Sequence, residues 1–229
     1  MAPAPLALPV PATAAPAPRF CLAPTFPALS QNLGGPHLPA LELAFGAFAG
    51  ANAEPAAGAY LPGFLAGAPG YQDRPELVEL AAFEWALFAA AQAPDRPVLP
   101  PGDLDGLSTR DWGALRVILH PCLTRVGTEW NSVALWRAVQ QETRPPSPVR
   151  EPCPRAWAVW RHATRSRFRP LPMEDAVALD LAARGRPFGE ICRTLWPEHP
   201  PSDAAARAAA MVGDWMAAGW VSGLSRRSY

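Results

Sequence analysis

The amino-acid sequence predicts a mainly α-helical protein with a small α+β part, in which an N-terminal helical domain precedes a winged-helix-like β-β-α-α-α-β domain. Apolar residues recur at helical spacing between Pro and Gly breaks over residues 24–143, which favours successive helices. Residues 157–171 instead alternate with period two, the spacing of a β-strand. Five prolines within residues 143–154 separate the two patterns and predict a linker.

The charge distribution supports the same division. Residues 1–143 carry 7 Arg against 12 Asp and Glu, a net charge of −5, whereas residues 144–229 carry 13 Arg against 8 acidic residues, a net charge of +5. The front of the chain is therefore acidic and the back is basic. Because the chain as a whole is neutral, we do not expect a nucleic-acid partner.

Localisation follows from what the sequence lacks. It has no run of 18 apolar residues, and its first basic residue, Arg19, follows the apolar N-terminal stretch, so we expect neither a membrane association nor a secretory signal. The four cysteines are scattered and form no C-x-x-C pair, so no zinc ribbon or thioredoxin-type motif is indicated. We expect a cytoplasmic protein with free thiols.

Four segments are predicted in order along the chain. Residues 1–19 are a Pro/Ala-rich stretch expected to be a disordered tail. Residues 20–143 are predicted to form the helical domain, and residues 144–153 the Pro-rich linker. Residues 154–224 form the small α+β domain.

Within the helical domain, the segment 73–95 gives the strongest helix signal. Pro75 suits the first helical turn and Pro94 ends the pattern. The segment 108–121 is also predicted as a helix, which Pro121 would stop. Further helices are expected over residues 36–50, 59–71 and 131–142, the last with Asn131 at the N-cap position.

The α+β domain begins with a predicted hairpin over residues 156–171. Its second strand places Arg165, Arg167 and Arg169 on one face. Three helices are expected to follow, and the final stretch, 219–224, is expected to return as a strand beside the hairpin. The arginine row suits a solvated face, a nucleic-acid backbone or an acidic peptide.

No catalytic motif is present in the sequence. It lacks a phosphate-binding glycine loop, H-E-x-x-H, G-x-S-x-G and any His/Cys cluster with metal-ligand spacing. We therefore expect no catalytic residue, no metal site and no cofactor in this chain. A DNA-binding regulator of winged-helix type and an independent thiol enzyme are the alternatives to a binding protein.

Glu84 is the most informative carboxylate, because it falls on the apolar face of the predicted helix 73–95. A buried carboxylate is costly unless it is partnered. His120 and the arginines near it are the candidate partners. The alternatives for Glu84 are a structural bond joining two helices, a contact with a partner protein and a catalytic role.

Several stretches together resemble the HvfC/BufC family of peptide-modification chaperones, over roughly residues 24–220. In order, they are FPALSQNLG, YLPGFLAG, LVELAAFEWALFAAAQA, LRVILHPCLTRVGTEWNSVALWRAVQQE and WAVWRHATRSRFRPLPMEDAVALDLAARG. Each is a loose motif, but their order and spacing make the match specific. The sequence is most similar to the short members that serve methanobactin-type maturation.

This resemblance implies a non-catalytic subunit that forms a heterodimer with an MbnB-like TIM-barrel multinuclear iron oxygenase. The iron belongs to the oxygenase, and the pair modifies cysteines of a ribosomally made precursor peptide. A module of this kind is expected to capture the leader of the precursor as an added β-strand.

Two groups of residues are assigned on this basis. The peptide-binding group comprises Trp157, Val159, Trp160, Arg161, His162, Arg165, Arg167, Phe168 and Arg169. The partner-interface group comprises Tyr60, Phe64, Glu84, Trp85, His120, Trp130 and Trp136.

Overall fold

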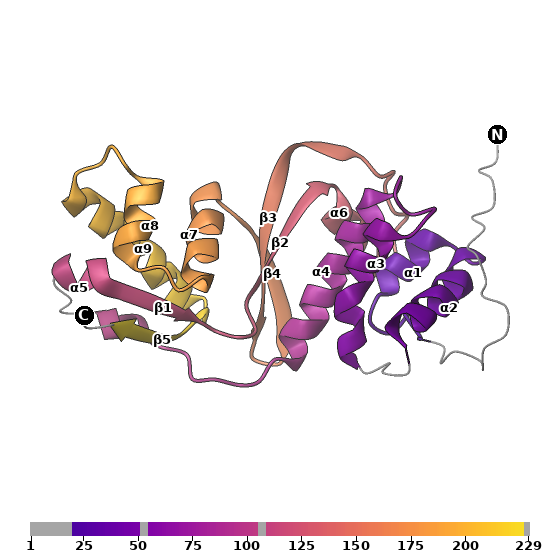
Figure 1. Cartoon of the computed structure of the whole chain (residues 1–229), viewed down its shortest axis with the longest axis horizontal. Helices are drawn as coiled ribbons and strands as arrows, with labels where there is room; N and C mark the ends of the chain where they lie inside the picture. Colours follow the sequence, from indigo (N-terminus) through magenta and orange to yellow (C-terminus); the bar gives the residue numbers. More distant parts are fainter. Residues whose placement is uncertain (1–19, 51–54, 105–108, 227–229) are drawn as a thin grey trace. The chain divides into compact units, whose positions relative to one another are not determined.

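The computed structural model describes residues 20–50, 55–104 and 109–226. The predicted tail, 1–19, lies outside the described residues. The elements run in the order α1 (Pro27–Leu33), α2 (His37–Ala49), η1 (Pro55–Tyr60), α3 (Leu61–Gly67), α4 (Pro75–Gln92), η2 (Pro101–Leu104), α5 (Thr109–Ala114), β1 (Leu115–Leu119), β2 (Thr124–Trp130), α6 (Ser132–Gln140), β3 (Arg150–His162), β4 (Arg165–Leu171), α7 (Met173–Ala183), α8 (Phe188–Leu195), α9 (Pro201–Ala217) and β5 (Val221–Arg226) (Figure 1). The protein is mainly α with a small α+β part, as predicted, and its strands pair antiparallel in two small sheets.

The chain forms two compact units, and their division differs from the predicted one. Met1–Phe88 and Gly127–Pro154 make the N-terminal unit, while Ala89–Val126 and Arg155–Tyr229 make the C-terminal unit. Residues 89–126 therefore pack with the basic half of the chain instead of the helical domain. The predicted linker also differs, because its residues from Arg150 onward are already part of β3.

The N-terminal unit is organised around α4, whose Leu77, Leu80 and Ala81 are buried in its core. The carboxylate of Glu79 accepts the backbone N–H of Glu129 at 2.7 Å and that of Trp130 at 3.0 Å. Side chains of α4 therefore satisfy backbone donors of other segments as well as filling the core.

The core of the C-terminal unit is formed by the three helices α7, α8 and α9 with β1 and β5. Trp215 at the end of α9 and Trp220 just before β5 are both fully buried. The helix order is the predicted one, but one helix prediction and one strand-pairing prediction are wrong. Residues 115–119, expected within a helix, form β1, and β5 pairs antiparallel with β1 instead of with the hairpin. The mainly apolar stretch Leu115–Leu119, which includes Arg116, suits a strand as well as a helix, and the backbone pairing with β5 decides between them.

The second sheet has the strand order β2-β3-β4, which places β3 in the middle and β4 at one end (Figure 1). The predicted hairpin is confirmed: β3 and β4 are antiparallel, with Ala156 opposite Leu171 and His162 opposite Arg165. Ala163, in the two-residue turn, has a φ of 52°, the left-handed conformation that such tight hairpin turns use. Within the described part of the chain, none of the helices is long and apolar enough to cross a membrane.

Candidate functional site

The β3–β4 hairpin is the candidate site, because it carries all nine residues assigned to peptide binding. Its register places His162, Trp160 and Ala158 opposite Arg165, Arg167 and Arg169 respectively. Directly opposite residues share a face of an antiparallel sheet, so the three arginines do lie on one face.

The three arginines do not form a uniform exposed row. Arg165 and Arg167 are exposed, whereas Arg169 is half-buried. The guanidinium carbon of Arg169 lies 4.3 Å from the ring centre of Trp220, a cation–π contact with a core residue. Arg169 therefore packs against the core, and the exposed part of the arginine row is Arg165 and Arg167.

The apolar residues assigned to peptide binding are largely inside the protein. Val159 is fully buried and Trp157 is 6% exposed. The ring of Trp157 meets that of Phe168 edge to face at 5.9 Å, and Trp160 meets Trp220 in the same way at 5.3 Å. These side chains hold the hairpin in its unit, and they leave the edge of β4 and its exposed arginines as the part that an extended peptide could contact.

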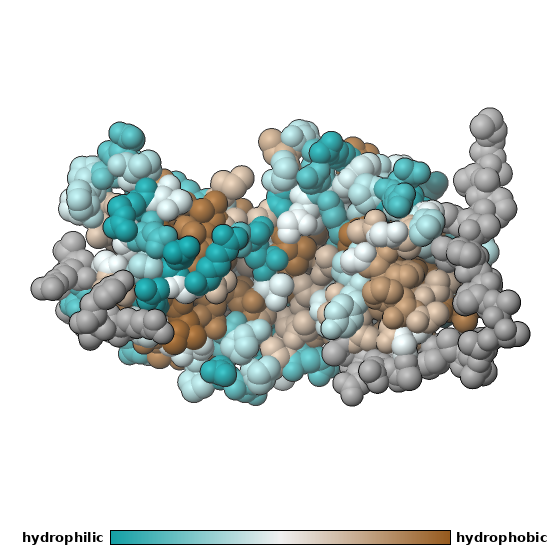
Figure 2. Space-filling model, in the orientation of Figure 1, coloured by the Kyte–Doolittle hydropathy of each residue, from teal (hydrophilic) through white to brown (hydrophobic). Residues whose placement is uncertain are grey.

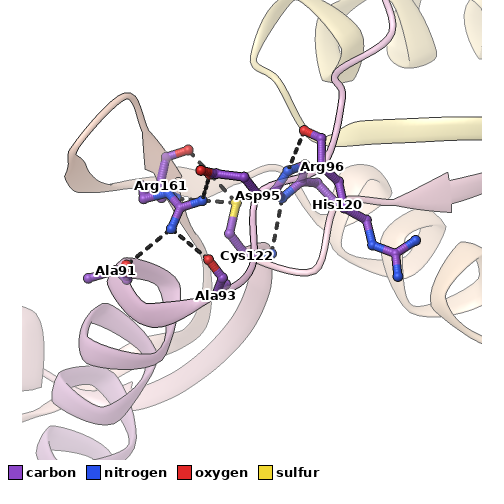
Figure 3. Close-up of polar contacts among 7 residues, drawn as sticks. All are labelled: Ala91, Ala93, Asp95, Arg96, His120, Cys122 and Arg161. Carbon is purple, nitrogen blue, oxygen red and sulfur yellow. Dashed lines mark hydrogen bonds and ion pairs between the residues drawn. The ribbon is translucent and has the colours of Figure 1, made fainter.

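Arg161 is fixed by a set of contacts within the C-terminal unit (Figure 3). Its Nη1 donates to the backbone carbonyls of Ala91 at 3.1 Å and Ala93 at 2.6 Å, and its Nη2 pairs with the carboxylate of Asp95. The two carbonyls are at the C-terminal end of α4, where a cation stabilises the helix. Only 15% of the Arg161 side chain is exposed, against 95% of the Asp95 side chain.

Cys122 and His120 form the neighbouring part of this cluster (Figure 3). The thiol of Cys122 lies 3.4 Å from the backbone nitrogen of Arg161, which donates to it. The backbone N–H of Cys122 donates to Nδ1 of His120 at 3.2 Å, and Nε2 of His120 lies 3.2 Å from the carbonyl oxygen of Arg96. In this arrangement Nδ1 is placed to accept a hydrogen bond, and Nε2 is placed to donate one to the Arg96 carbonyl oxygen. His120 is thus largely buried and is bonded within the C-terminal unit.

A cavity of about 380 Å³ opens beside this cluster. Asp95, Arg96, His120, Arg161 and His162 contribute its polar lining. His162 is exposed at the end of β3 next to the turn. The cavity therefore combines a fixed guanidinium with several other polar groups, an arrangement suited to binding an anion.

The residues assigned to the partner interface are only partly on the surface. Tyr60 is 64% exposed, and Phe64 is half-buried against Phe48, with ring centres 5.0 Å apart. Phe48 itself is 58% exposed but was not among the assigned residues. It lies three residues after buried Phe45 in α2, a spacing that by itself predicts the same buried helix face. Figure 2 shows apolar surface over the helices of the N-terminal unit.

The assigned tryptophans are mostly occupied within the N-terminal unit. Trp85, Trp130 and Trp136 are half-buried, and the ring of Trp136 meets that of Phe83 edge to face at 5.6 Å. We therefore name exposed Phe48 and Tyr60, together with half-buried Phe64, the α2–α3 aromatic surface and use this term below.

Glu84 is buried, as predicted, but neither His120 nor an arginine is its partner. Its two carboxylate oxygens accept the backbone N–H groups of Ala28 at 2.7 Å and Leu29 at 2.9 Å, in the first turn of α1. Burial raises the pKa of Glu84 to about 7, although both hydrogen bonds act to lower it. Of the alternatives considered for Glu84, the structural bond joining two helices is the one observed.

The described residues hold no group of three or more His, Cys, Asp or Glu side chains placed to bind one metal ion together. The cysteines at positions 21, 122, 153 and 192 are all free thiols. Among known proteins, no family model matches the chain, and no curated protein sequence matches it either.

Proposed function

We propose that this chain is a non-catalytic partner subunit that binds a ribosomally made precursor peptide and presents its cysteine-containing core to a TIM-barrel multinuclear iron oxygenase. The peptide product is of the methanobactin type, and the iron and the oxidative chemistry belong to the oxygenase. The proposal combines the family resemblance of the sequence with the geometry of the hairpin.

The observation that carries the proposal is the position of β4. This strand is the last in its sheet and bears the exposed guanidinium groups of Arg165 and Arg167. An extended peptide can add to such an edge through backbone hydrogen bonds. These bonds contribute to the affinity for the peptide whatever its side chains are. Two exposed arginines beside the edge favour a leader with acidic residues, since they attract carboxylates from solution and can pair with them.

The α2–α3 aromatic surface supports the proposed contact with the oxygenase. Exposed aromatic side chains are enriched at the centres of protein interfaces, where each can contribute more than its neighbours. Phe48 and Tyr60 are each more than half exposed, and Phe64 packs against Phe48. We assign this surface, and not the half-buried tryptophans, to the contact with the oxygenase.

The charges on the C-terminal helices favour a peptide over DNA as the ligand. A winged-helix regulator needs a recognition helix with cationic side chains for phosphates and base edges. The longest candidate, α9, carries Arg207 as its basic residue together with Asp203 and Asp214, a net charge of −1. Within α8, Glu190 balances Arg193.

Complex formation tests the proposal. The chain is co-expressed with a candidate TIM-barrel iron oxygenase and analysed by size-exclusion chromatography with light scattering. A stable 1:1 heterodimer that retains the co-expressed precursor peptide is the expected result. Separate elution of the two proteins, or a complex that binds duplex DNA in preference to the peptide, contradicts the proposal.

A further inference from the structure

The pairing of Arg161 with Asp95 is unusually asymmetric. The Arg161 side chain is 15% exposed and is held on one side by the carbonyls of Ala91 and Ala93, whereas the Asp95 side chain is 95% exposed. The guanidinium is therefore fixed in place, while the carboxylate reaches it from a residue that is otherwise in water. Replacing the exposed carboxylate of such an ion pair by another carboxylate costs little free energy, because an exposed pair contributes little to stability.

The carbonyl contacts also explain why the guanidinium is ready to bind an anion. Nη1 donates to both backbone carbonyls, which leaves Nη2 directed at Asp95 (Figure 3). A guanidinium whose orientation is already set loses less conformational freedom on binding than a mobile one.

The surroundings provide space for a ligand. Asp95 and Arg161 both line the cavity of about 380 Å³, together with His162 at the end of β3. His162 lies directly opposite Arg165, one of the two exposed arginines of β4. The cavity is thus next to the hairpin turn, at one end of the strand edge where the peptide is proposed to bind.

We propose that Arg161 is an anion-binding residue, that Asp95 is its displaceable internal counter-ion, and that the ligand is a carboxylate side chain of an acidic peptide. Asp95 then has two effects: it holds Arg161 in the absence of ligand, and it competes with the incoming carboxylate. The identity of the ligand as part of a leader peptide rests on the proposed function, but the anion site itself rests on the contacts above.

The test uses the full chain alone and a blocked tetrapeptide probe, acetyl-Asp-Glu-Asp-Glu-amide, measured by calorimetry at low salt. Asp95→Asn removes the competitor, so we expect the probe to bind about three- to fivefold more tightly, the range that corresponds to an exposed ion pair. The control is Asp103→Asn, which removes an equally negative exposed side chain of the same unit from η2. It should change the affinity by less than about twofold, through long-range electrostatics alone.

A double variant distinguishes binding of the probe at Arg161 from a general effect of net charge on its affinity. In Asp95→Asn combined with Arg161→Gln, the gain in affinity should disappear. Arg161→Lys in place of Arg161→Gln provides a variant that keeps a donor for the α4 carbonyls, and thermal melting of each variant shows that it is folded. The neutral probe acetyl-Asn-Gln-Asn-Gln-amide should not distinguish the variants.

Three results overturn the proposal: equal effects of Asp95→Asn and Asp103→Asn, a gain that survives the loss of Arg161, or no saturable binding of the acidic probe to any variant at millimolar concentration. The oxygenase and the precursor are absent from this experiment. Its failure would therefore leave complex formation with the oxygenase untouched, and failure of complex formation would leave the anion site untouched.

Discussion

The carboxylate of Glu84, in the middle of α4, accepts the backbone N–H of Leu29 in the first turn of α1 at 2.9 Å. Helix α1 has no side-chain cap of its own, since its N-cap residue is Phe26. Glu84 satisfies two of its otherwise unpaired N–H groups from a distant part of the chain. This contact joins two helices of the N-terminal unit and gives its stability a dependence on pH.

The direction of that dependence follows from the pKa of Glu84, which burial raises from 4.5 to about 7. The folded state binds the proton more tightly than the unfolded chain, so this contribution to stability is complete below pH 4.5 and is lost as the pH rises through 7. We expect the free energy of unfolding of the wild type, relative to Glu84→Gln, to fall by up to about 3 kcal/mol across this range. Urea unfolding at several pH values measures the difference, and two parallel curves would contradict the assignment.

Gly58 provides a test of the packing around Trp85. A Cβ atom on Gly58 would lie 2.5 Å from Cζ3 of Trp85, much closer than atoms can approach. We expect Gly58→Ala to lower the free energy of unfolding by about 1–3 kcal/mol, the usual cost of overpacking. Gly63→Ala is the matched control, because a Cβ there meets no atom within 4 Å and lies inside α3. It should leave stability unchanged or raise it by about 0.5–1 kcal/mol through helix propensity. Equal effects of the two changes would show that η1 does not pack on Trp85 as described.

Substitutions in the arginine row should fall into two classes by their effect on the free energy of unfolding. Arg169→Ala removes a half-buried side chain that lies over the ring of Trp220, so we expect a loss of about 1–2 kcal/mol in the free energy of unfolding. Arg165→Ala removes an exposed side chain and should change stability by less than about 0.5 kcal/mol. Chemical denaturation of the two variants measures both values. A loss at position 165 as large as that at position 169 would refute the division of the row.

The α2–α3 aromatic surface should dominate the affinity for the oxygenase. We expect Phe48→Ser to weaken the heterodimer by about tenfold or more, as truncation of an aromatic interface anchor does. Val149→Ser is the control, since Val149 is 57% exposed in the same unit but lies apart from these aromatic residues in sequence. Surface plasmon resonance on an immobilised oxygenase measures both, with melting curves to exclude unfolding. If Val149→Ser weakens binding as much as Phe48→Ser, the interface has been assigned to the wrong surface.

Local sequence patterns were sufficient to predict those elements that form through contacts between residues close together in the sequence. The helix 73–95 is observed as Pro75–Gln92, and the period-two stretch is observed as the β3–β4 hairpin. The strand β1 could not be predicted in the same way, because Leu115–Leu119 becomes a strand by pairing with β5, more than 100 residues later in the chain. Its apolar composition is compatible with a helix or a strand, and only a distant partner resolves the choice.

The candidate site likewise depends on contacts with distant residues, which the sequence pattern does not predict. The period of the hairpin correctly predicted which residues share a face, but burial depends on what lies across that face. Trp220 covers Arg169, and the carbonyls at the end of α4 hold Arg161. For Glu84, the sequence indicated a buried carboxylate that needs a partner, and the partner proved to be backbone N–H groups, which no residue type in the sequence identifies.

The affinity of the precursor peptide for the chain in complex with the oxygenase, measured by calorimetry at low and high salt, tests the central proposal most directly. The double variant Arg165→Ala/Arg167→Ala is compared with Arg184→Ala/Arg193→Ala, which removes the same charge from exposed positions of the C-terminal unit outside the hairpin. If the peptide binds along β4, the first variant should bind about tenfold more weakly than the wild type at low salt, and the difference should shrink at high salt, where charge pairs are screened. Unchanged affinity of the hairpin variant, or an equal loss in both variants, would contradict the account.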